Sequence, residues 1–190
     1  HSDIVNYDGL SLVFIDSEWL MHTEDKDFEQ ALTVLQKQLE SIRSAYPNNL
    51  IVAGAHHPLV TEGQHAGYTT HFAYWFFVKL IYMVFDVDQD IDHPTYLNMI
   101  NGLNAVFSKF PKVVFAAGHD HSLQVFKMAE GVGPTYQIVS GAANSNKVSG
   151  VWHNEFTRFA LSQEGFVELN ITANGKVHFS AFDVHHKNAV

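Results

Sequence analysis

Apolar residues follow a strand, helix, strand order in the first third of the chain. Residues 12–15 are a β-branched and aromatic run, for which we expect a strand buried on both faces. Apolar positions then recur at steps of three and four over residues 28–42, which predicts an amphipathic helix with Asp25 or Asp27 as its cap. Residues 50–54 form a second apolar run. The short connections predict a parallel βαβ unit.

The pattern is less regular in the rest of the chain. We expect an insertion over about residues 66–110, with a helix at its end that begins at Pro94, and a third buried strand over 112–118. Antiparallel strands are expected after this strand. The final two strands, 167–171 and 177–181, alternate apolar and polar residues on either side of a predicted type I′ turn, so they should form a hairpin with one apolar face.

Length and composition indicate one globular unit. The 190 residues are 46% hydrophobic, so residues 1–190 are expected to form a single α/β domain or a piece of one. The net charge of −9 comes without a lysine or arginine run, which argues against nucleic acid as a partner. The longest apolar run, over 72–85, contains Lys79 and is shorter than the roughly 20 residues that cross a bilayer, so we expect no transmembrane segment.

Histidines follow the predicted strands. The chain holds 13 histidines and no cysteine, so thiolate ligands are excluded. His56 and His57 follow the second buried strand, and His119 and His121 follow the third. Ligand sites of open α/β sheets lie at the carboxyl ends of the strands, and a neutral imidazole offers one lone pair to a cation. The pattern therefore predicts a metal site.

The motifs around these histidines resemble those of calcineurin-like metallophosphoesterases. Residues 54–58, Gly-Ala-His-His-Pro, look like the His-x-Pro motif of that family, and residues 118–121, Gly-His-Asp-His, look like its Gly-His-x-His motif. His65 lies nine positions after His56, and Gly-Val-Gly at 131–133 precedes Ser-Gly-Ala at 140–142. This combination is nearest to purple acid phosphatases of tartrate-resistant type, and it covers roughly residues 10–180.

The resemblance implies a fold and a reaction. The fold would be the C-terminal half of an αββα sandwich, in which helices flank two sheets. The reaction would be hydrolysis of a small phosphate ester by a metal-bound hydroxide at a two-metal centre of iron, zinc or manganese, divalent or of mixed valence. Secretion or a periplasmic location is favoured only by analogy with exported relatives.

The resemblance also implies residue roles. His56 and His119 would bind one metal ion and His121 the other. His65 would act in catalysis, as a hydrogen-bond donor to phosphate or a proton source for the leaving group. His57 and Asn144 are candidates for binding the substrate, although turn chemistry explains an asparagine at 144 equally well.

Departures from the family pattern restrict this interpretation. The upstream motifs that carry the bridging carboxylate and other ligands are not found in order, and the chain opens at His1 without a methionine. Two cations held only by neutral imidazoles would repel each other strongly. We therefore expect this chain to be inactive until a missing N-terminal half of the same protein supplies the remaining ligands.

Two other functions are compatible with the sequence. The chain would be a non-catalytic pseudo-phosphatase or protein-binding scaffold if the upstream ligands have been lost. It would be a phosphoesterase acting at a lipid surface if the aromatic run over 72–85 contacts lipid. That run fits equally a core helix or a hydrophobic wall over the substrate site.

Overall fold

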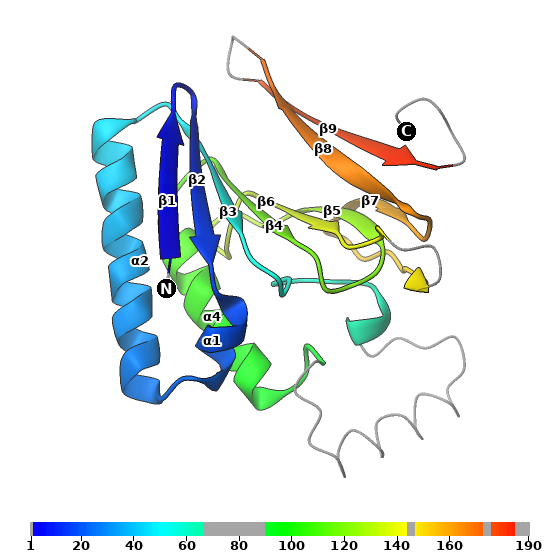
Figure 1. Cartoon of the computed structure of the whole chain (residues 1–190), viewed down its shortest axis with the longest axis horizontal. Helices are drawn as coiled ribbons and strands as arrows, with labels where there is room; N and C mark the ends of the chain where they lie inside the picture. The colour runs from blue at the N-terminus through cyan, green and yellow to red at the C-terminus, as the bar shows by residue number, and fades with distance from the viewer. Residues whose placement is uncertain (1, 67–89, 144–146, 173–175, 185–190) are drawn as a thin grey trace.

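The computed structural model describes residues 2–66, 90–143, 147–172 and 176–184. A seven-stranded mixed sheet runs in the order β1-β2-β3-β4-β6-β5-β7, and β8 pairs with β9 in a separate two-stranded sheet. Helices cover one face of the large sheet, and the β8–β9 hairpin lies on its other side (Figure 1). The strands are β1 Ser2–Tyr7, β2 Leu10–Ile15, β3 Leu50–Gly54, β4 Val113–Ala117, β5 Leu123–Lys127, β6 Tyr136–Ser140, β7 Thr157–Leu161, β8 Gly165–Ile171 and β9 Val177–Asp183.

The predicted βαβ unit is confirmed. β2 is parallel to β3, and β3 is parallel to β4. The connecting helix α2 spans Asp25–Ala45, but its cap differs from the prediction. Glu24 is the N-cap and makes no side-chain cap hydrogen bond, while Asp25 and Asp27 lie in the first turn, where their charges favour the positive end of the helix dipole.

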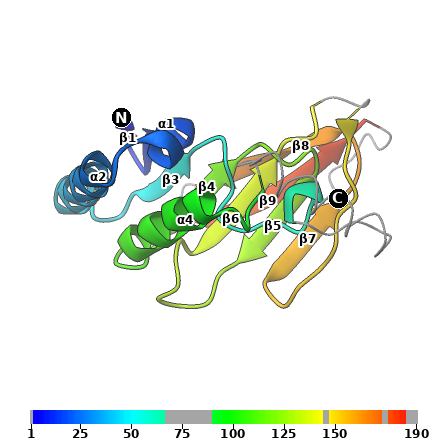
Figure 2. The same cartoon turned by 90° about the horizontal axis from the view of Figure 1, so that it is seen from below.

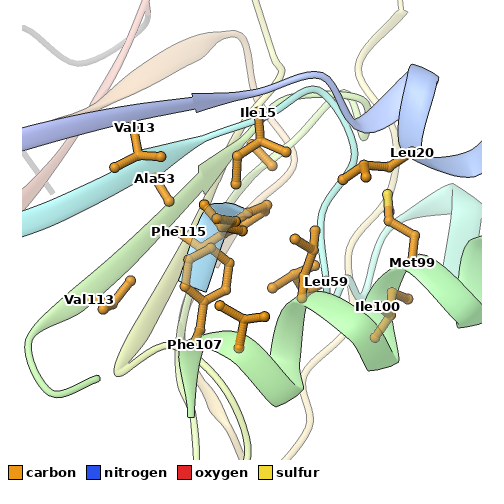
Figure 3. Close-up of a cluster of buried hydrophobic side chains, with 14 of the residues drawn as sticks. Val13, Ile15, Leu20, Ala53, Leu59, Met99, Ile100, Phe107, Val113 and Phe115 are labelled. Atoms are coloured by element: carbon orange, nitrogen blue, oxygen red, sulfur yellow. The ribbon is translucent and has the colours of Figure 1, made fainter. Parts of the chain in front are cut away.

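The main core lies between the helices and the sheet. Helix α4, Pro94–Phe107, begins where the sequence predicted and ends three residues before Phe110, the predicted end. It contacts both α2 and the short helix α1, Ser17–His22. Its Phe107 ring packs 5.7 Å from the Phe115 ring of β4, so α4 lies against the sheet (Figures 2 and 3). Each such side chain contributes about 1.5–3 kcal/mol through burial.

Some predictions about the strands were wrong. β2 is not buried on both faces, because Val13 is fully buried while Phe14 is 51% exposed. The strands after β4 are not all antiparallel, since β6 is parallel to β4 and only its pairing with β5 is antiparallel. β1 was not predicted because it is a mostly exposed edge strand with polar residues, antiparallel to β2.

The predicted terminal hairpin is confirmed. Val167, Leu169 and Ile171 of β8 pack with β9 residues onto a second, smaller core on the sheet, formed by Leu50, Val114 and Ile138. The hairpin therefore covers the sheet face opposite the helices.

The predicted turn at 173–175, the aromatic run over 72–85 and Asn144 lie outside the described residues. Within the described part of the chain, no helix combines the length and apolar character needed to cross a membrane.

Candidate metal centre

Neighbouring parallel strands bring the predicted histidines together. His56 and His57 follow β3, and His119 follows β4. The two loops remain tied beyond the strand ends, because the Ala55 amide donates to the Ala116 carbonyl at 3.0 Å and the Gly118 amide donates to the His56 carbonyl at 3.1 Å. The sheet thus holds the backbones that carry the three rings next to one another.

The imidazoles of His56, His57 and His119 form a compact cluster. One ring nitrogen from each lies within 4.8 Å of the others. The ring centroids of His56 and His119 are 5.1 Å apart, and that of His57 lies 4.7 Å from each. Nε2 of His56 and Nδ1 of His119 are 3.3 Å apart. Two nitrogens bound to one tetrahedral zinc ion at 2.0–2.1 Å are also separated by about 3.3 Å.

The backbone at His119 adopts an unusual conformation. Its φ of +60° places it in the left-handed region, which costs a residue other than glycine roughly 1–2 kcal/mol. His119 is the central residue of a tight turn in which the Asp120 amide donates to the Gly118 carbonyl at 2.8 Å. In the next turn the Ser122 amide donates to the Asp120 carbonyl, also at 2.8 Å. Strained backbone of this kind concentrates at functional sites.

Asp120, on the loop that follows β4, ties that loop to the one that follows β3. Its carboxylate is fully buried, accepts a hydrogen bond from the Thr61 hydroxyl, and accepts another from the His65 amide at 3.2 Å. The sequence shows this carboxylate inside the second motif, but its partner Thr61 is 59 residues away along the chain. A hydrogen bond of that range leaves no signal in the local pattern, so this role was missed.

Tyr96 of α4 supports the cluster from the helix side. Its hydroxyl donates to the Pro58 carbonyl at 2.9 Å, and its ring lies 5.4 Å from the His57 ring. Burial raises the pKa of the Tyr96 phenol, and the nearby Asp120 carboxylate raises this pKa further. Tyr96 therefore stays neutral as a hydrogen-bond donor and fixes the turn behind His57.

The side chains of two buried glutamines hold the loop that follows β3. The side-chain oxygen of Gln137 accepts from the amides of Leu59 and Val60 at 2.7 and 3.0 Å. The side-chain oxygen of Gln124 accepts from the Glu62 amide at 2.9 Å. Both glutamines are fully buried, Gln124 in β5 and Gln137 in β6, and a polar residue in an apolar run is the only sequence signal for such a positioning role.

The other predicted site residues lie in different places. The His65 ring lies 4.2 Å from the His119 ring, so His65 borders the cluster. His121 lies on the same loop as His119, and its carbonyl accepts from the Ser149 amide at 2.9 Å, but it is not a member of the three-imidazole group. The ring of His57 is fully buried.

The donor set of the cluster fits one cation better than two. Three imidazoles suit a zinc-like ion, and zinc sites with three protein ligands keep one coordination position open. Among the described residues, the group includes no carboxylate. Glu18 comes near, with Oε2 3.7 Å from Nε2 of His57. A two-metal centre would therefore need further ligands, as the sequence already indicated.

Comparisons with known proteins show what the fold is similar to. No protein-family model and no curated protein sequence matches the chain. The structure of GAP50, the anchor in the inner membrane complex of Plasmodium, is similar at 16% identity and a TM-score of 0.53, covering 96% of this chain and 49% of that one. A purple acid phosphatase, PPD1 from yellow lupin (Lupinus luteus) seeds, is similar at 15% identity and a TM-score of 0.59, covering 100% of this chain and 31% of that one.

These likenesses confirm the expected fold class. The mixed sheet with its helices has a metallophosphoesterase-like arrangement, in agreement with the resemblance drawn from the motifs. The chain spans half or less of the length of both neighbours. At such low identity the likeness concerns the fold alone.

Proposed function

We propose that this chain supplies the histidine side of a metal-dependent phosphatase site that hydrolyses phosphate esters, most simply monoesters. The observation that carries the proposal is the convergence of His56 and His119 at the ends of adjacent parallel strands, with nitrogens 3.3 Å apart. Ligands of open α/β sheets bind at that edge. A fold shared with a purple acid phosphatase supports the same assignment.

The proposed cofactor is a pair of metal ions, iron, zinc or manganese, held by His56 and His119 on one side and by His121 on the other. When bound, such ions activate water near neutral pH and neutralise charge on the phosphoryl oxygens. The buried Asp120 carboxylate keeps the loops in place, because it bonds to Thr61 and to the His65 backbone. The proposal requires carboxylate ligands in addition to these histidines.

His65 is the proposed proton donor to the leaving oxygen. Its ring lies 4.2 Å from the His119 ring, and Asp120 fixes its backbone through the His65 amide. A phosphate ester facing the cluster would therefore lie within reach of the His65 imidazole, and histidine is the side chain that most often transfers protons in catalysis. His57 and Asn144 remain proposed contacts to the substrate side of the site, and Asn144 lies outside the described residues.

Removal of metal should abolish the activity. We expect the full-length protein to hydrolyse p-nitrophenyl phosphate, to lose this activity after dialysis against a chelator, and to regain it with added zinc, manganese or iron. Near-ultraviolet circular dichroism before and after dialysis serves as the control for intact folding. Unchanged hydrolysis by protein shown by elemental analysis to be metal-free would contradict the proposal.

A protein-binding scaffold is the second candidate. The observation that favours it is the likeness to GAP50, which is described as an anchor, over 96% of this chain. A three-imidazole group without a carboxylate is also compatible with a site that has lost catalysis. Folded, metal-loaded full-length protein that hydrolyses no phosphate ester would support the scaffold and reject the phosphatase.

A further inference from the structure

We infer that His57 is a third imidazole ligand of the cation held by His56 and His119, and that Ser17 is a positioning residue that orients it. The cation at this position would be a zinc-like divalent ion, held by three imidazoles. This inference rests on the metal site of the proposed function but goes beyond it. The motif resemblance gives His57 no metal, and it names His121 as the third histidine ligand.

The geometry places His57 with the two other ligands. Its ring centroid is equally far, 4.7 Å, from those of His56 and His119, and its ligand nitrogen lies within 4.8 Å of theirs. His57 is fully buried and His119 is 9% exposed, so these two imidazoles are largely removed from water. Neutral imidazole is the usual form in which histidine binds zinc.

Ser17 contacts His57 at two atoms. The Ser17 hydroxyl oxygen accepts from the His57 amide at 3.2 Å and lies 2.9 Å from Nδ1 of the His57 ring. A hydroxyl oxygen has two acceptor lone pairs, so it also accepts from an Nδ1–H group. In that tautomer Nε2 keeps its lone pair. A metal-binding histidine usually donates its second ring N–H in this way, which fixes the ring and its tautomer.

Helix α1 holds Ser17 in position and brings negative charge to the site. The Asp16 side chain caps this helix by accepting from the Trp19 amide at 2.9 Å, and Ser17, the first residue of the helix, is 1% exposed. Glu18 Oε2 lies 3.7 Å from His57 Nε2. The negative charge of a carboxylate near the metal-binding nitrogen favours a bound cation. The carboxyl end of β2 thus contributes to the site together with the ends of β3 and β4.

The test measures zinc affinity, which does not depend on catalysis. The variants are His57→Gln and Ser17→Ala, with His153→Ala as the control because His153 is exposed and outside the cluster. The zinc affinity of each variant of the full-length protein would be measured by competition with a chromophoric chelator. Glutamine keeps a polar side chain of similar size next to Ser17. Thermal unfolding of metal-free samples identifies any variant that does not fold.

We expect the zinc dissociation constant to rise about 10- to 100-fold in Ser17→Ala, as for other partners of metal-binding histidines, and by at least as much in His57→Gln. His153→Ala should match the wild type. Wild-type affinity in His57→Gln would overturn the inference. X-ray absorption of the wild type at one equivalent of zinc needs no variant: three imidazoles are expected, and two would also overturn it.

This result is separable from the outcome for the phosphatase. If the inference alone fails, hydrolysis remains metal-dependent while His57→Gln binds zinc normally. If the proposed function alone fails, zinc binding depends on His57 while the protein hydrolyses no phosphate ester.

Discussion

Replacing His119 with asparagine in the full-length protein is expected to lower phosphate-ester hydrolysis by about 100-fold or more and to reduce the bound metal. The imidazole removed lies 3.3 Å from the partner nitrogen of His56, so one ligand of the shared cation is lost. A metal ion contributes several kcal/mol of transition-state stabilisation, and each 1.36 kcal/mol is a factor of ten in rate.

Asparagine is chosen because of the backbone at this position. The φ of +60° at His119 is one that asparagine adopts more readily than most residues, so the substitution tests the ring and spares the turn. Rate and metal content would be measured beside the exposed control His153→Ala. Wild-type turnover and metal content in His119→Asn would remove His119 from the site.

The second large effect is expected from Gly141→Ala, which tests the packing under the cluster. An added Cβ at residue 141 would lie 2.1 Å from the Asp120 carbonyl oxygen and 2.9 Å from its carbonyl carbon. Backbone atoms cannot move aside as a flexible side chain does, and the Gly141 amide is itself bonded to the Ser122 carbonyl at 3.2 Å. We expect a loss of about 3 kcal/mol in the free energy of unfolding.

Gly150→Ala is the matched control for this prediction. A Cβ at residue 150 meets nothing within 4 Å, so its effect on stability should stay within about 0.5 kcal/mol. Denaturant unfolding of both variants in the full-length protein gives the comparison. Equal stability of Gly141→Ala and Gly150→Ala would show that the 118–122 loop does not pack against residue 141 as described.

The sequence predicted the elements whose burial is periodic. α2 repeats its apolar positions every three or four residues and was found, although its N-cap was not, and the β8–β9 hairpin alternates every second residue and was also found. Elements without such a signal were missed. β1 is a polar edge strand, and α1 is only six residues long, too short to show a helical period.

The sequence predicted only the part of the candidate site that local motifs encode. Short motifs place histidines after strands, and the parallel order of β3 and β4 brings His56 and His119 together. The contacts that shape the site join distant positions, such as Ser17 with His57, 40 residues apart, and Thr61 with Asp120, 59 apart. Only the folded chain reveals those pairs, because no local pattern encodes them.

Anomalous X-ray diffraction from crystals of the full-length protein grown with zinc is the most direct test of a cation at this cluster. A peak at the zinc edge is expected about 2.0–2.1 Å from Nε2 of His56 and from Nδ1 of His119. Fully occupied zinc elsewhere in the protein, with no anomalous peak between these two rings, would contradict the account.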